Sequence, residues 1–119
     1  MKNRKVLLVV ESTTKAMDRA FAALTKGSKV DKNIEIISFP DYATLGRVIT
    51  GARLELLSNI KIMKPHSIQE LARLVKRDFK NVYQDIRLLA DFGLIELKES
   101  GPRKSAEPKA KYSQIILAA

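Results

Sequence analysis

The chain has no cysteine, which excludes disulfide bonds and metal sites built on thiolates. Its single histidine, His66, lies between Pro65 and Ser67 in a segment that we expect to be an exposed loop. His66 has no evident Ser or Cys partner for nucleophilic catalysis, and no group of His or carboxylate residues has metal-ligand spacing. The nucleotide-binding patterns GxGxxG and GxxxxGKS/T are absent too. We therefore expect no metal, no cofactor and no enzymatic activity.

Long hydrophobic runs are also missing. No apolar stretch approaches the ~20 residues that a transmembrane helix needs. The sequence begins with MKNRKVLLVVES, in which the apolar run Val6–Val10 is shorter than the core of a signal peptide and is not followed closely by a small-residue cleavage site. We therefore predict a strand here, no membrane partner and a cytoplasmic protein, and the lack of cysteine agrees with a reducing compartment.

Positive charge is abundant. The 119 residues include 22 Lys and Arg against 13 Asp and Glu, which gives a net charge of +9 and a pI near 9.9. Such an excess favours polyanionic partners, of which nucleic acid is the obvious one and an anionic membrane surface the competitor. With 45% hydrophobic residues, the chain can build one domain with a modest extension.

Residues 67–76 have the pattern of a short helix with a capped start. Ser67 and Glu70 form the pattern S-x-x-E ahead of an apolar run, so that each side chain can satisfy a free amide at the helix start. This predicts a helix that begins near Ile68. Apolar residues recur in it at helical spacing, at Ile68, Leu71, Ala72 and Val75.

A second helix is predicted after only Lys76 and Arg77, because Asp78 offers another N-cap. Gly93 supplies the left-handed residue that commonly ends such a helix. The expected buried stripe is Val82, Ile86, Leu89 and Ala90. Two helices with so short a connection indicate a helix-turn-helix, whose second helix can lie in the major groove of DNA. A purely structural helix pair could show the same apolar stripe.

The segment after the second helix predicts a β-hairpin with a basic tip. Leu94–Glu99 alternates apolar and polar side chains, as in a strand with one buried face. The next residues, SGPRKSAEPKA, are typical of an exposed loop and include Arg103 and Lys104. Tyr112–Leu117 is expected to return as the second strand. The order helix, helix, strand, basic loop, strand is that of a winged helix domain.

Four motifs also carry a family resemblance over about residues 41–117. They are TGARLELL at 50–57, KPHSIQELA at 64–72, RDFKNVYQDIRLL at 77–89 and FGLI at 92–95. With these motifs the chain resembles prokaryotic winged helix-turn-helix transcriptional regulators of the broad MarR-like superfamily. More narrowly, it resembles a group of small predicted regulators that includes antitoxin partners of toxin genes. The resemblance implies binding to double-stranded DNA and, for the narrower group, a toxin protein as partner.

The first forty residues predict a small extension. Lys5–Val10 and Ile34–Phe39 have the composition of strands, and they flank a helical stretch at about Thr13–Thr25. Pro40 and Asp41 mark a stop followed by a new helix start. The expected fold class is therefore α+β, with an N-terminal β-α-β extension at residues 1–40 and a winged helix-turn-helix domain at residues 41–119.

The start of the second domain is predicted to be helical from Asp41 to about Met63, with a break near Thr50 and Gly51. Thr50 can cap the helix that follows. The expected inward face of that helix is Leu54, Leu57, Ile60 and Ile62.

The N-terminal extension could serve as a dimer interface, because a two-stranded unit buries little by itself. Packing across a two-fold axis would make a homodimer whose second helices reach successive major grooves ~34 Å apart. The alternative is that the extension folds back on its own winged domain.

The candidate DNA-binding residues lie on the helix-turn-helix and on the basic loop. They are Ser67, Gln69, Arg77, Lys80, Asn81, Tyr83, Gln84, Arg87, Arg103 and Lys104. Cations would neutralise phosphates, and the amides of Asn81 and Gln84 can bond adenine in the major groove.

Most of these residues also have a purely structural interpretation. Ser67 is expected to be a cap first, and Arg77, Lys80 and Arg87 could each simply solvate a helix face. Tyr83 could pack at the helix surface. Phe79 is expected to lie in the core or to support the helix, with base stacking as the alternative. Asp85 is either an ion-pair partner or a reader of cytosine.

The expected function is that of a sequence-specific double-stranded DNA-binding transcriptional regulator, most simply a repressor that blocks a promoter. Activation remains open. The alternative is an antitoxin or another protein-binding module that neutralises a partner protein. A third hypothesis is a winged helix used only for protein assembly.

Overall fold

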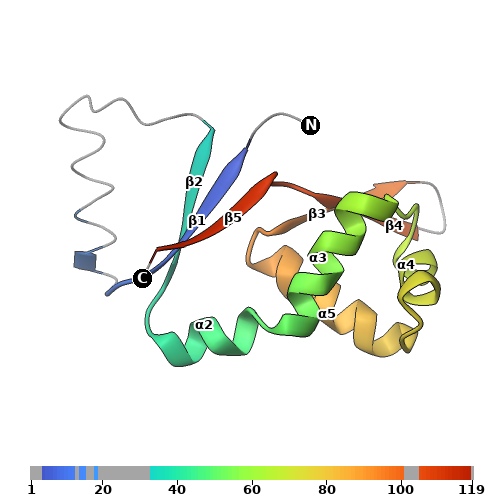
Figure 1. Ribbon diagram of the computed structural model, residues 1–119, viewed down its shortest axis with the longest axis horizontal. Helices are drawn as coiled ribbons and strands as arrows, with labels where there is room; N and C mark the ends of the chain where they lie inside the picture. The colour runs from blue at the N-terminus through green and yellow to red at the C-terminus, as the bar shows by residue number, and fades with distance from the viewer. Residues whose placement is uncertain (1–3, 13, 16–17, 19–32, 101–104, 119) are drawn as a thin grey trace. The chain divides into compact units, whose positions relative to one another are not determined.

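The computed structural model describes residues 4–12, 14, 15, 18, 33–100 and 105–118 (Figure 1). The strands among them are β1 (Lys5–Val10), β2 (Ile34–Phe39), β3 (Ile95–Ser100), β4 (Ser105–Ala110) and β5 (Gln114–Ala118). The helices are α2 (Tyr42–Val48), α3 (Gly51–Met63), α4 (Ile68–Val75) and α5 (Phe79–Asp91). The fold class is therefore α+β, as expected. Two compact units divide the chain, one of residues 1–47 and 112–119, the other of residues 48–111.

The first unit contains a three-stranded parallel sheet in which β1 lies between β2 and β5 (Figure 1). Both strands predicted in the first forty residues are confirmed with their expected bounds. Parallel strands need a crossover of a dozen or more residues, and the segment between β1 and β2 has room for one. The helix expected at Thr13–Thr25 falls almost entirely outside the described residues.

Apolar side chains of β1 and β2 form the core of the first unit. Val6, Leu8 and Phe39 are almost completely buried. Burial of each such side chain contributes roughly 1.5–3 kcal/mol to the free energy of folding. The near-continuous apolar sequence of β1, KVLLVV, suits a central strand with neighbours on both sides.

A polar cluster joins the three strands of this unit near their beginnings. The Tyr112 hydroxyl donates to Glu35 Oε2 at 2.5 Å, and the Arg4 guanidinium pairs with the other Glu35 oxygen. Arg4 also lies over the Tyr112 ring, with its guanidinium carbon 5.9 Å from the ring centroid. The Ser113 amide donates to the Arg4 carbonyl at 2.7 Å, so the residues before β5 are tied to those before β1.

The expectation that Tyr112–Leu117 returns as the second strand of the hairpin is wrong. β3 pairs in antiparallel register with β4, from Ile95 opposite Ala110 to Ser100 opposite Ser105, and β4 comes from the segment expected to be a loop. β5 instead pairs with β1.

Cross-strand chemistry explains the choice of partners. In the β3–β4 pair, Glu96 faces Lys109 and Lys98 faces Glu107, and opposite charges at facing positions stabilise an antiparallel pair. The apolar run of β5, QIILA, suits a place beside the apolar β1. As a result, residues 112–119 group with the N-terminal segment, and not with the residues that precede them.

The predicted break near Thr50 and Gly51 is confirmed, since α2 ends at Val48 and α3 begins at Gly51. Thr50 caps α3, and its Oγ1 accepts from the Arg53 amide at 3.2 Å. Asp41 Oδ1 accepts from the Thr44 amide at 2.7 Å, and this hydrogen bond holds the pKa of Asp41 below its ordinary value.

The inward face of α3 differs from the expected one. Leu56, Leu57 and Ile60 are buried, whereas Leu54 is 43% exposed and Ile62 is 73% exposed. At about 100° per residue, Ile62 lies nearly half a turn around the helix from the buried stripe. Its hydrophobicity therefore did not indicate burial.

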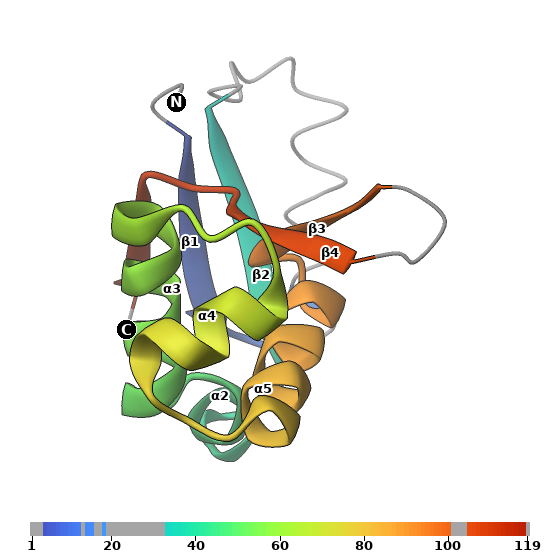
Figure 2. The ribbon, with the colours of Figure 1, turned by 90° about the vertical axis from the view of Figure 1, so that its right-hand side faces the viewer.

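The second unit has its core between α3, α4 and α5, with the β3–β4 hairpin packed against these helices (Figure 2). Fully or nearly buried side chains come from every element: Leu56, Leu57, Ile60, Ile68, Leu71, Ala72, Val82, Ile86, Leu89, Ile95 and Pro108. No helix in the described part of the chain has the length and apolar character needed to span a membrane.

Candidate nucleic-acid interface

The first helix of the predicted pair starts with an ordered cap. Ser67 Oγ accepts from the Glu70 amide at 3.0 Å, as the S-x-x-E pattern predicts. The Glu70 carboxylate accepts from the His66 amide at 3.1 Å. A capping box would use the amide of the next residue, Ser67. His66 itself is exposed. The cap occupies the Ser67 hydroxyl, so its structural interpretation is confirmed.

The connection between α4 and α5 consists of Lys76, Arg77 and Asp78. Lys76 adopts a left-handed conformation with φ 57°, and its amide donates to the carbonyls of Ala72 and Arg73. Because this turn ends α4 abruptly, α5 can begin at Phe79. Asp78 stands at the expected N-cap position, but its side chain accepts no capping hydrogen bond. Its φ of −59° contrasts with the extended −155° of Ser67, which holds its hydroxyl over the helix amides.

The end of α5 agrees with the sequence. Gly93 has φ 83°, a conformation that is strained for any residue with a Cβ. Its amide donates to the Ala90 carbonyl at 3.0 Å, and the Leu94 amide donates to Leu89 at 2.9 Å. These bonds close the helix and direct the chain into β3.

The two faces of α5 differ completely in character. On its inner face, Val82, Ile86 and Leu89 are fully buried. Five of the ten candidate DNA-binding residues are exposed together on the remaining surface: Lys80, Asn81, Tyr83, Gln84 and Arg87. Two cations, two amides and one hydroxyl thus lie on one helix, and all are groups that can donate hydrogen bonds to phosphates or base edges.

Arg77 lies in a different environment from these five. Its Nη2 donates to Asp85 Oδ2 at 2.8 Å, while Arg53 Nε donates to Asp85 Oδ1 at 3.1 Å. Arg53 also donates to the Val48 carbonyl at 3.1 Å. The Asp85 side chain is only 15% exposed, so the ion-pair role is the one observed for it.

Two candidates, Ser67 and Gln69, lie at the beginning of α4. Together with Glu70 and Arg73 they line a polar hollow of about 350 Å³. Gln69 and Arg73 are exposed there. Arg73 was not among the predicted residues, although its place four residues after Gln69 puts both on one side of the helix. The basic candidates Arg103 and Lys104 lie outside the described residues.

Phe79 was expected to lie in the core or to support the helix, and the structure places it outside the core. Its side chain is 42% exposed and stacks on Tyr83, which is 44% exposed, with ring centroids 5.7 Å apart. Phe79 is the first residue of α5, to one side of the stripe that begins at Val82, so the interior is filled without it. Phe79 and Tyr83 are four residues apart in one helix, a spacing that could have indicated the contact between their rings.

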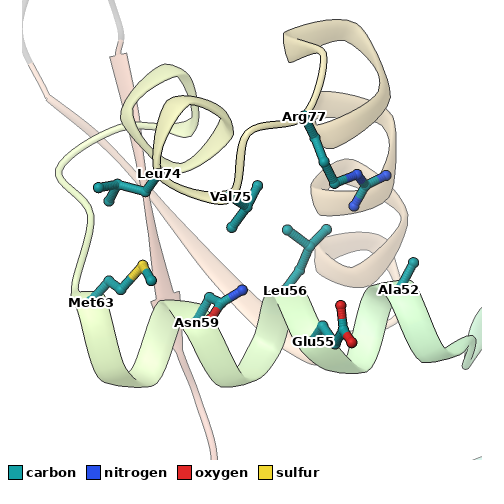
Figure 3. A pocket seen from close by; sticks show the side chains of 8 residues that line it. All are labelled: Ala52, Glu55, Leu56, Asn59, Met63, Leu74, Val75 and Arg77. Atoms are coloured by element: carbon teal, nitrogen blue, oxygen red, sulfur yellow. The ribbon is translucent and has the colours of Figure 1, made fainter.

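A second hollow, of about 160 Å³, lies between α3 and the end of α4 (Figure 3). Leu74 and Val75 of α4 face Leu56, Asn59 and Met63 of α3 across it. Its other lining residues are Ala52, Glu55 and Arg77. No group of His, Cys, Asp or Glu among the described residues could hold a metal ion.

These features define an α+β protein with a short helix pair, a following hairpin and an exposed polar helix. A comparison with protein families identifies the family of this chain. The family model HVO_A0114 matches residues 48–117, which is more than half of the chain, and the chain belongs to the HVO_A0114 family. Neither the curated proteins nor the solved structures gave a significant match.

Proposed function

We propose that this protein is a sequence-specific double-stranded DNA-binding transcriptional regulator that acts as a repressor. In this proposal, residues 48–111 are a winged helix-turn-helix domain, α5 is the recognition helix and the β3–β4 hairpin is the wing. One observation carries the proposal. The inner face of α5 is fully buried, while Lys80, Asn81, Tyr83, Gln84 and Arg87 are exposed on the rest of the same helix.

The short connection at 76–78 supports this assignment. A recognition helix must project from its scaffold so that its first residues reach base edges while the preceding helix crosses the phosphates. Asn81 and Gln84 are amides in the first half of α5, and each can make two hydrogen bonds with adenine. Gln69, exposed at the start of α4, is in the position of a phosphate contact.

The electrostatics of the helix pair also favour a polyanion. Lys76, Lys80 and Arg87 are exposed, and the one carboxylate near the middle of α5, Asp85, is paired with two guanidinium groups. Phosphate neutralisation by such cations makes affinity fall steeply with salt. A chain with net charge +9 adds long-range attraction to the same partner.

A homodimer is part of the proposal, because symmetric DNA readers use two copies of one helix. The register of the parallel sheet puts Ile36, Leu7 and Ile116 side by side across β2, β1 and β5. Ile36 and Ile116 are exposed, so this row offers apolar surface to a second copy. Light scattering should give a dimer mass, and Ile36→Asp should shift it to that of the monomer. A monomeric wild type would exclude this arrangement.

The same apolar row favours a second candidate function, an antitoxin or other protein-binding module that neutralises a partner protein. A toxin-like reading frame beside the gene would supply the partner to test. Co-purification that is abolished by Ile36→Asp and unaffected by Gln84→Ala would support protein binding through the sheet.

The proposed function is tested by measuring binding to the DNA directly upstream of the protein's own gene and to an unrelated duplex of equal length, across a salt series. Wild type is compared with a Gln84→Ala, Arg87→Ala double variant. A Ser58→Ala, Lys61→Ala variant is the matched control, because it removes the same charge from α3.

Wild type and control should prefer the upstream DNA, and the α5 variant should lose that preference. Equal, salt-sensitive binding of wild type to both duplexes would reduce the interaction to non-specific attraction. If wild type binds neither duplex at low salt, the result would indicate that the helix pair serves in protein assembly and not in DNA binding.

A further inference from the structure

We infer that the stacked pair Phe79–Tyr83 contacts thymine C5-methyl groups in the major groove, so that α5 selects A·T base pairs at one end of its site. This inference rests on the proposed function and specifies part of its base recognition. It adds an apolar contribution to a surface otherwise made of cations and amides.

The geometry of the pair is the first support. The rings lie 18° from parallel with centroids 5.7 Å apart, and both side chains are more than two-fifths exposed. Two large aromatic rings held together on a water-facing helix surface are not needed for the core, which Val82 and Ile86 already fill. An exposed apolar patch with a polar rim is typical of an interaction site.

The surroundings of the pair indicate a polyanion. Lys80 lies beside the two rings in sequence, and Arg87, four residues after Tyr83, continues the same side of the helix by one turn. Two carboxylates lie near the pair: Asp78, the exposed N-cap residue before Phe79, and Asp85, which is held by Arg53 and Arg77. An apolar patch flanked by cations matches a ligand that combines negative charge with apolar groups.

In a DNA major groove, the thymine methyl is the apolar group. Phe79 and Tyr83 belong to the first two turns of α5, the part of a recognition helix that contacts base edges. The pair is therefore positioned for methyl contacts, while Gln84 on the neighbouring strip of the helix is positioned for hydrogen bonds to bases. The rival occupant of the patch is an apolar side chain of a partner protein.

Replacement of thymine by uracil tests the inference directly, because uracil pairs with adenine in the same way and lacks only the methyl group. The probes are the upstream duplex, the same duplex with uracil in place of thymine, and an unrelated duplex in both forms. Wild type should bind the thymine form of the upstream duplex about fourfold more tightly for each methyl buried. Wild type should bind the thymine and uracil forms of the unrelated duplex with the same affinity.

Three variants locate the effect. A Phe79→Ala, Tyr83→Ala double variant should bind both forms of the upstream duplex equally while still preferring them to the unrelated duplex. Tyr83→Phe, which keeps the ring, should retain the thymine preference. Leu54→Ala, which removes a comparably exposed apolar side chain from α3, should also retain it.

The inference is overturned if wild type prefers the upstream duplex but binds its thymine and uracil forms equally. It is also overturned if the double variant keeps the wild-type ratio, or if Tyr83→Phe loses it. All these results leave the proposed function intact. If wild type shows no preference for the upstream duplex at all, the proposed function fails and the inference fails with it.

Discussion

Asp85 on α5 accepts a hydrogen bond at 2.8 Å from Arg77, the middle residue of the connection between α4 and α5. The second oxygen of the same carboxylate accepts from Arg53 on α3 at 3.1 Å. One side chain thus ties α5 both to the preceding turn and to the supporting helix. The bonds hold the orientation of the exposed residues of α5, because a rotation of the helix about its axis would break both.

Removal of that carboxylate should destabilise the second unit. Asp85→Ala leaves two largely covered guanidinium groups without their partner, and we expect the free energy of unfolding to fall by about 1–2 kcal/mol, since the group retains some contact with water. Urea unfolding followed by circular dichroism measures the change. The exposed Asp91, at the end of the same helix, provides the control: Asp91→Ala should change stability by less than about 0.5 kcal/mol. Equal effects of the two variants would contradict the ion-pair argument.

Charge on the outer face of α5 should set the salt dependence of DNA binding. If Lys80 contacts a phosphate, Lys80→Gln should reduce the slope of log K against log salt by about 0.9, because one fewer counterion is released. Fluorescence anisotropy at several salt concentrations gives the slope. Lys61→Gln on α3 carries the same loss of charge and should leave the slope near its wild-type value. A similar reduction in both variants would mean that net charge, and not a contact by Lys80, determines binding.

Two glycines should respond to substitution in opposite directions. Gly93 has φ 83°, so Gly93→Ala should lower the unfolding free energy by about 1 kcal/mol or more, although open space surrounds the added Cβ. Gly46 lies within α2, and a Cβ added there would meet nothing within 4 Å, so Gly46→Ala should raise the unfolding free energy by about 0.5–1 kcal/mol. Thermal unfolding of the two variants separates these effects. Destabilisation by Gly46→Ala would show that this position has a constraint beyond helix propensity.

Tyr112 should make stability depend on alkaline pH. Burial, together with the hydrogen bond to Glu35, raises the pKa of Tyr112 above its ordinary value of 10.0. The folded state therefore favours the neutral phenol. Its contribution to the free energy of unfolding is fully present below pH 10, and this contribution is lost as the pH rises from there through the raised pKa of the folded state. Urea unfolding at several pH values should show that wild type is more stable than Tyr112→Phe at neutral pH and that the difference shrinks above pH 10. A difference that stays constant would contradict the proposed coupling.

Local features of the fold were predictable because their causes lie within a few residues. The caps at Thr50 and Ser67 and the left-handed Gly93 depend on side chains and backbone conformations that are specified by neighbouring positions. The stripe Val82, Ile86 and Leu89 repeats at the helical period, so it identified the buried face of α5. The exposed candidate residues followed from the same periodicity.

Features that depend on distant partners were not predictable in the same way. Hydrophobicity at Leu54, Ile62 and Phe79 suggested burial, but the position of each residue around its helix, relative to the elements packed against it, left it exposed. Local helix propensity is the same whether such a residue faces the core or the solvent. The packing of the whole unit therefore decides between the two orientations.

By itself the sequence determined the α+β class, the helix pair with the Ser67 cap, the two N-terminal strands and the polar outer face of α5, because short-range periodicity and capping chemistry specify them. Tertiary structure alone decided that β4 and not β5 pairs with β3, and that Asp85 binds Arg53 and Arg77. It also decided that the stacked ring of Phe79 faces solvent. The reason is that strand pairing and ion pairing join residues far apart in the chain, and local propensity is the same whichever partner is chosen.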